Sequence, residues 1–191
     1  VAYKDYFWMM DFVEKMLERV ALALHNKTAL QVGEREIDFR SPFRRLTMSD
    51  AIKQYAGVDI SGKSEDELRL ICKELNIETD PTMGAGKLID AIFGEKCEEH
   101  LVQPTFIMDY PIEMSPLCKR HRSNPELTER FELFVNGKEL CNAYSELNDP
   151  IDQLDRFQQR RVLIVIGQRL HQADATLLVV TGARIERNLG D

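Results

Sequence analysis

Several features that would mark a function class are scarce or missing in this 191-residue sequence. No apolar run approaches the roughly 20 residues that a membrane-spanning helix needs, and the N-terminus lacks the basic-then-apolar pattern of a secretory signal. Of the four cysteines, no two have the spacing of a metal or redox motif, which favours reduced thiols inside a cell. We therefore expect a soluble, cytoplasmic protein with no membrane partner. The cysteines are Cys72, Cys97, Cys118 and Cys141.

Positive charge is also in short supply, because 25 lysines and arginines face 32 acidic residues and give a formal charge of −7. This balance argues against a broad surface that coats nucleic acid, although it leaves room for a local basic patch. One such patch is the loop CKRHRS, residues 118–123. Its Arg122 is a candidate anion contact, since guanidinium groups suit bidentate recognition of phosphate. The alternative is an ordinary solvated charged loop.

A complete phosphate-binding loop is missing too. The segment DPTMGAGK, residues 80–87, ends like one, but Pro81 stands where the first glycine belongs, and Leu88 replaces the Ser or Thr that would hold Mg²⁺. It is predicted to be a flexible loop that leads into a helix. The sequence also opens on Val1, within a hydrophobic pattern and without an initiator Met. We therefore expect a fragment or a processed product.

Apolar residues at helical spacing predict several helices. Ser49 and Ser64 are suitable N-caps for two of them, and Glu67 completes a capping box with Ser64. The helices are predicted at residues 3–24, 50–55, 64–75, 86–100 and 151–159.

Strand-like runs alternate with these helices. The strands are predicted at residues 101–109, 130–135 and 138–147, with a pair over 30–39 that turns near Gly33. Beyond residue 160, the apolar runs 162–167 and 176–182 could on pattern alone be two buried strands.

The two runs at 130–135 and 138–147 flank Asn136-Gly137, a strong signal for a two-residue hairpin turn. In such a hairpin Phe134 pairs with Glu139, so Glu139 shares a face with Glu132, a diagonal neighbour at roughly 7–8 Å between Cα atoms. Two carboxylates at that range can hold one Mg²⁺ together with substrate phosphates and water. The alternative is a pair of surface glutamates on a wet face.

Farther along the second strand, Asn142, Tyr144 and Glu146 recur at every second position and share a face. A carboxylate with an amide and a phenol suits a ligand that carries an ammonium group. A regular strand would place odd-numbered Glu139 on the opposite face. A single pocket therefore requires a β-bulge between Glu139 and Asn142, which we predict.

The segment FIMDYPIEMSPLCKRHRSNPELTERFELFVNGKELCNAYSELNDPIDQ resembles the catalytic core of class II lysyl-tRNA synthetases of the eukaryotic cytosolic kind. AYKDY near the N-terminus and SPFRRLTMSDAI fit the same family. The resemblance implies an α+β fold with an antiparallel sheet and flanking helices. It identifies residues 1–159 as a partial catalytic domain.

The family joins lysine to tRNA(Lys) at the expense of ATP, through a lysyl-adenylate. By resemblance, Glu132 and Leu133 lie beside ATP, and Glu132 and Glu139 hold Mg²⁺. Asn142, Tyr144 and Glu146 form the lysine pocket, with Glu146 facing the ε-ammonium. The family forms homodimers, although the segment that would build the interface is not in this sequence.

The sequence also departs from the family. The arginines of its second and third motifs have no counterpart here, so this chain alone is expected to show negligible lysine-dependent exchange between ATP and pyrophosphate. Residues 160–191 do not follow the family pattern and are interpreted as a divergent tail. Two alternatives stay open. One is a non-catalytic paralogue that binds lysine or a protein partner, and the other is a small α/β nucleotide-binding protein built on the tail strands.

Overall fold

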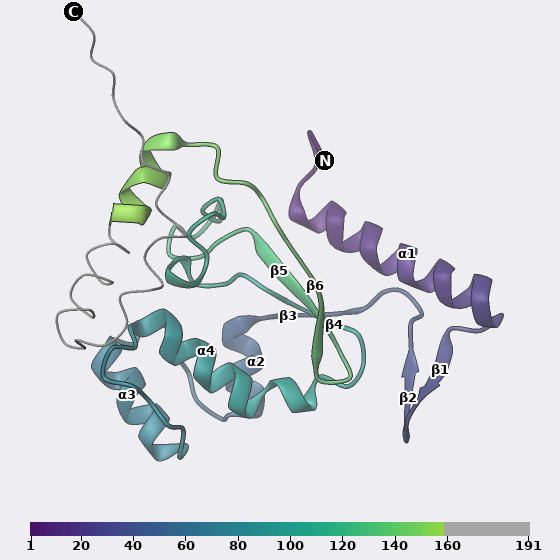
Figure 1. Ribbon diagram of the computed structural model, residues 1–191, viewed down its shortest axis with the longest axis horizontal. Coiled ribbons are helices and arrows are strands. Elements are labelled where there is room, and N and C mark those ends of the chain that lie inside the picture. The colour runs from purple at the N-terminus through teal and green to yellow at the C-terminus, as the bar shows by residue number, and fades with distance from the viewer. Residues whose placement is uncertain (159–191) are drawn as a thin grey trace, which may run out of the picture. The chain divides into compact units, whose positions relative to one another are not determined.

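The computed structural model describes residues 1–158 of the chain (Figure 1). It divides into a compact unit, Val1–Gln153, and a second unit that begins at Leu154. The predicted tail, with its two apolar runs, lies outside the described residues. Within residues 1–158, none of the helices is long and apolar enough to cross a membrane.

A four-stranded sheet with the order β3-β4-β5-β6 forms the centre of the first unit. Strands β4, β5 and β6 are antiparallel neighbours, as predicted, whereas β3 runs parallel to β4 and makes the sheet mixed. A parallel pair needs a crossover connection, and the helices between β3 and β4 supply it. The strands span Arg44–Thr47 (β3), Thr105–Met108 (β4), Arg130–Val135 (β5) and Lys138–Tyr144 (β6).

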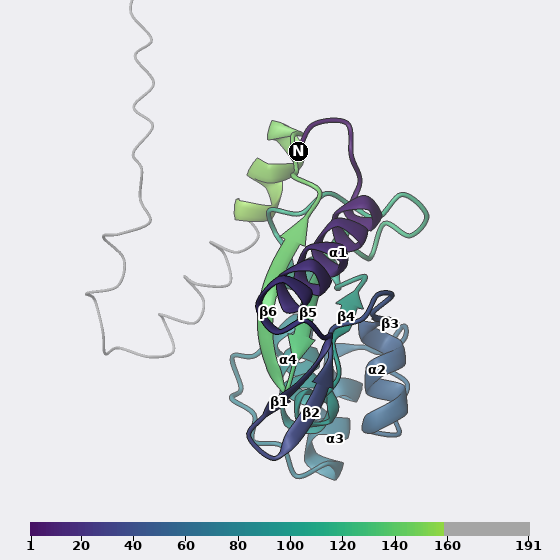
Figure 2. The same ribbon diagram turned by 90° about the vertical axis from the view of Figure 1, so that its right-hand side faces the viewer.

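Helix α1, Tyr6–His25, packs on one face of this sheet (Figures 1 and 2). Its N-terminus is capped by Asp5, whose side chain accepts from the Trp8 amide, and Asn26 ends it in the left-handed conformation. A separate two-stranded sheet of β1, Ala29–Val32, and β2, Arg35–Asp38, follows and turns at Gly33 as predicted. The buried contacts under α1 are made by Tyr6, Met10, Val13, Phe43, Phe106, Phe131 and Leu133.

Three helices share one buried cluster with the opposite face of the sheet: α2, Met48–Tyr55, α3, Glu65–Glu74, and α4, Ala85–Lys96. Helix α3 packs against α4. The capping box of Ser64 and Glu67 on α3 is confirmed. Helix α4 ends earlier than predicted and is followed by a 3₁₀ turn, Glu98–His100. Residues 150–158 are helical, in agreement with the helix predicted over 151–159.

The N-cap of α2 is Thr47 and not Ser49. The Thr47 hydroxyl accepts from the Asp50 amide at 3.0 Å, so the helix begins at Met48. Strand β3 runs directly into this helix. Thr47 is therefore both the last residue of β3 and the N-cap of α2. The preference of single residues for cap positions does not predict such a junction of strand and helix.

Gly86, in the segment that resembles a phosphate loop, has a packing role instead. A Cβ built on Gly86 would lie 3.0 Å from the Glu113 Cβ and 3.3 Å from the Glu113 carbonyl carbon. The glycine thus lets α4 approach the short 3₁₀ turn η2, Ile112–Met114. This close approach requires a residue without a side chain.

We expect Gly86→Ala to destabilise the protein by about 1–2 kcal/mol, although alanine favours helix by about 1 kcal/mol. The cause is the backbone of η2, which cannot move aside as a flexible side chain would. Chemical denaturation monitored by circular dichroism measures the change. Gly94→Ala on the same helix is the matched control, because its Cβ would meet only the Glu98 side chain at 3.9 Å. It should be neutral or stabilising, and an equal loss in both variants would contradict the packing role.

Candidate functional site

The β5–β6 hairpin turns at Asn136 and Gly137, which have φ values of 55° and 72°. Val135 pairs with Lys138 and Phe134 with Glu139, which is the predicted register of a two-residue turn. The Asn136 and Gly137 amides donate to the carbonyls of Val102 and Leu101. These bonds fix the tip of the hairpin to the strand connection beside it.

A β-bulge interrupts β6 at Leu140. Phe134 pairs with Glu139 and Leu133 pairs with Cys141, so Leu140 has no partner on β5. The extra residue shifts the alternation of side chains by one position, so Glu139 and Asn142 lie on the same face of the sheet. Asn142 is the β6 partner of Glu132, and Glu132 therefore shares that face. The predicted bulge between Glu139 and Asn142 is confirmed.

Glu132 is the most heavily bonded carboxylate on this face. Its Oε2 accepts from the Tyr110 hydroxyl at 2.8 Å, and its Oε1 accepts from the Asn142 amide at 3.1 Å and from the Arg130 guanidinium. Only 11% of the Glu132 side chain is exposed. Neither Tyr110 nor Arg130 was predicted as a site residue. The single available signal was that Arg130 and Glu132 stand two residues apart on one strand and so share a face.

Glu132, Glu139 and Glu98 lie close enough for their charges to affect one another. Burial raises the pKa of Glu132 and the charge of Glu139 adds to the rise, while Tyr110 and Arg130 oppose it. Burial also raises the pKa of Glu98, and the charges of Asp90, Glu132 and Glu139 contribute in that order. A cation placed among these carboxylates would relieve their mutual repulsion.

The donor chemistry of this face fits Mg²⁺. Carboxylate oxygens are its preferred protein ligands, and one or two of them suffice when substrate phosphates and water complete the shell. Glu132 and Glu139 would be those two. Across residues 1–158, no group of three or more His, Cys, Asp or Glu side chains is placed to hold a metal by itself.

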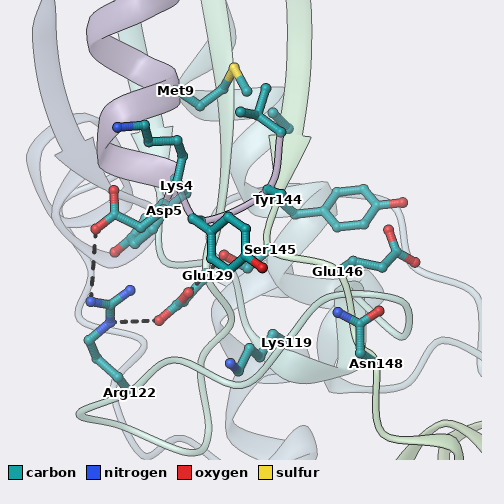
Figure 3. A pocket seen from close by; sticks show the side chains of 15 residues that line it. Lys4, Asp5, Met9, Lys119, Arg122, Glu129, Tyr144, Ser145, Glu146 and Asn148 are labelled. Atoms are coloured by element: carbon teal, nitrogen blue, oxygen red, sulfur yellow. Dashed lines mark hydrogen bonds and ion pairs between the residues drawn. The ribbon is translucent and has the colours of Figure 1, made fainter.

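A pocket of about 700 Å³ lies between the N-terminus of α1 and the end of β6 (Figure 3). It contains Tyr144 and Glu146 of the predicted ammonium site together with Arg122, whereas Asn142 does not line it and is bonded to Glu132. Tyr144 pairs with Arg130 and so shares the face of Asn142. Glu146 follows the end of β6 and bridges to Cys118.

Buried Glu129 lies in the wall of this pocket and was not predicted as a site residue. The Arg122 Nε donates to Glu129 Oε1 at 2.7 Å, and the Ser145 hydroxyl donates to Oε2 at 2.7 Å (Figure 3). Burial would raise the pKa of Glu129, but the hydrogen bonds from Arg122 and Ser145 outweigh it and lower the pKa. An anion contact by Arg122 stays a prediction. The Arg122 Nε is committed to Glu129, and its Nη1 forms an ion pair with Asp5 Oδ2 at 3.9 Å (Figure 3).

We expect Arg122→Ala to destabilise the protein by about 1–2 kcal/mol at neutral pH, because Glu129 then keeps one donor for its buried charge. The folded-state pKa of Glu129 is lowered, so this stability is present above the ordinary glutamate pKa of about 4.3 and is lost as the pH falls through the folded value. Chemical denaturation of wild type and Arg122→Ala between neutral and acidic pH measures the difference in their free energies of unfolding.

The difference between wild type and Arg122→Ala should shrink as the pH is lowered. Arg120→Ala is the matched control, because Arg120 forms an exposed ion pair with Asp152 and such pairs contribute about 0–1 kcal/mol. A loss in Arg122→Ala that does not depend on pH would contradict the assignment to Glu129.

Comparisons with known proteins identify the family of this chain. The family model described as tRNA synthetases class II (D, K and N) matches residues 1–180. Proteins described as lysine–tRNA ligase from Porphyromonas gingivalis, Christiangramia forsetii and Azobacteroides pseudotrichonymphae are 64%, 62% and 60% identical over 160 residues, or 84% of this chain. The chain spans 28% to 32% of the length of these relatives. All three are bacterial, so the eukaryotic cytosolic kind is not confirmed.

Proposed function

The chain belongs to the class II tRNA synthetases of the D, K and N group, and from this premise we propose that it carries part of the active site of a lysine–tRNA ligase. In the proposed reaction the lysine carboxylate attacks the α-phosphate of ATP, which gives lysyl-adenylate and releases pyrophosphate. The lysyl group then passes to tRNA(Lys), and AMP is released. The relatives described as lysine–tRNA ligase support this choice within the group.

The observation that carries the proposal is the bulge at Leu140. Because of this extra residue in β6, Glu139 and Asn142 lie on the same face of the sheet as Glu132 of β5. We propose that Glu132 and Glu139 hold Mg²⁺ and that Glu132 and Leu133 lie beside ATP. Bound Mg²⁺ would neutralise phosphate charge during attack by the lysine carboxylate. The protein's part is to keep both carboxylates in place, which Tyr110 and Arg130 do for Glu132.

We assign the amino acid to Asn142, Tyr144 and Glu146. An ammonium group has only donors, and a carboxylate, an amide oxygen and a phenol oxygen are acceptors for it. The carboxylate of Glu146 would select lysine, because an uncharged analogue would leave that charge unpaired. We further propose that the protein acts in the cytoplasm and forms the homodimer known in its family.

Isothermal titration calorimetry with lysine and with norleucine, its analogue without the ε-ammonium, tests the site. Lysine should bind at least about tenfold more tightly than norleucine, as expected when one charged group loses its partner. Equal affinity for the two amino acids would overturn the proposal. Lysine-dependent exchange between ATP and pyrophosphate, measured on the same protein, separates binding from catalysis. Binding without exchange is the result expected of this chain alone, and a non-catalytic paralogue would give the same result.

A further inference from the structure

The guanidinium group of Arg130 makes contacts to four other residues. Its Nη1 donates to the Ser115 hydroxyl at 2.9 Å and to the Met114 carbonyl at 3.3 Å, and its Nη2 donates to Glu132. The guanidinium carbon lies 4.5 Å from the centre of the Tyr110 ring. The guanidinium is thus held on one side by Ser115 and Met114, and its other side contacts Glu132.

Glu132 in turn decides how the Asn142 amide is oriented. An ionised carboxylate only accepts hydrogen bonds, so the group that Asn142 turns toward Glu132 must be its NH₂. The Asn142 Nδ2 lies 3.1 Å from Glu132 Oε1, the same oxygen that Arg130 contacts. The amide oxygen of Asn142 is then the end left for another donor, such as an ammonium group.

We propose that Arg130 is a positioning residue for recognition of the amino acid, acting through Glu132 on Asn142. Its charge compensates the buried Glu132 carboxylate and holds it within the protein, where Asn142 can donate to it. Without Arg130 the uncompensated carboxylate would turn toward water, because burial of an unpaired charge is costly. Asn142 would lose the acceptor that orients it. The link to lysine rests on the function proposed above, whereas the link from Arg130 to Asn142 does not.

Nuclear magnetic resonance of the ligand-free protein tests the link to Asn142 directly. The Asn142 side-chain amide signals, assigned by their absence from Asn142→Asp, should include one proton with slowed exchange that faces Glu132. Arg130→Met should bring that proton to the exchange rate of a solvated amide, and Arg130→Lys should restore part of the protection. Unchanged Asn142 signals in folded Arg130→Met would overturn the proposal, whether or not the protein binds lysine.

Tyr110→Phe serves as the second variant, since it removes only the bond to Glu132 Oε2 and keeps the ring under the guanidinium. It should leave the Asn142 proton protected. If Tyr110→Phe exposes that proton as fully as Arg130→Met does, the role belongs to Tyr110 and the assignment to Arg130 is wrong.

Amino-acid binding gives the functional readout. Arg130→Met should weaken lysine binding by about 10- to 100-fold, the range seen when the orienting partner of a metal-coordinating residue is lost, while norleucine binding changes little. Equal losses for lysine and norleucine would indicate general damage and would contradict positioning. If wild type fails to discriminate between the two amino acids, the proposed function fails, and the Asn142 signals still decide the role of Arg130.

Discussion

Replacing Glu146 by glutamine is expected to weaken lysine binding by about 30-fold, with little change in norleucine binding. Glutamine keeps the size and one acceptor of glutamate but removes the charge, so the loss isolates the pairing of the carboxylate with the ε-ammonium. Glu146 lines the pocket beside Tyr144 and is anchored through its backbone bridge to Cys118. The substitution should therefore leave the fold unchanged.

Titration of wild type and Glu146→Gln with both amino acids measures this effect. Glu126→Gln is the matched control, since Glu126 is an exposed glutamate in the neighbouring loop and does not line the pocket. Retention of full lysine selectivity by Glu146→Gln would show that another group receives the ammonium, and buried Glu129 would be the next candidate. A loss of similar size in Glu126→Gln would point to long-range charge instead of contact.

Phe131→Ala should lower the free energy of unfolding by about 3–5 kcal/mol, the usual cost of truncating a fully buried phenylalanine. Phe131 is 0% exposed and lies on the β5 face that packs against α1, with its ring 5.1 Å from Phe106 in an edge-to-face arrangement. Its neighbours Arg130 and Glu132 point to the other face. The cavity would therefore weaken the packing of α1 on the sheet. The hydrogen bonds of Glu132 on the other face should remain in place.

Thermal and chemical unfolding of Phe131→Ala gives the magnitude, with a fall in Tm of roughly 6–20 °C expected for a domain of this size. The matched control is Phe12→Ala on α1, because Phe12 is 48% exposed and stacks on Trp8 at 5.5 Å between ring centroids. It should cost less than about 1 kcal/mol. Similar losses in the two variants would mean that the α1 interface does not carry the stability assigned to it.

The features that the sequence predicted well depend on neighbours along the chain. Asn136-Gly137 specifies the hairpin because both positions need positive φ, and Ser64 with Glu67 specifies the start of α3. The bulge could also be inferred, since an odd-numbered Glu139 and an even-numbered Asn142 share one face of a strand only if an extra residue lies between them. In each case the relevant atoms are within a few residues of one another.

Where prediction failed, the deciding contact came from elsewhere in the fold. Ser49 had the right chemistry for a cap, but the junction of β3 with α2 gave that role to Thr47. The parallel pairing of β3 with β4 joins residues about 60 positions apart and has no local signal. The packing of Gly86 against η2 likewise joins two separate segments and had no local signal.

The sequence by itself determined the hairpin, its bulge, and the set of acidic and amide groups along one face, because strand alternation and turn chemistry are local properties. Only the tertiary structure decided which of these groups is buried and hydrogen-bonded, and which residues are its partners. Tyr110 reaches Glu132 from 22 residues away, and Arg130 is fixed by Ser115 and Met114 from a separate turn. Burial and hydrogen bonding of a carboxylate depend on what packs around it in three dimensions, and no spacing along the chain encodes that.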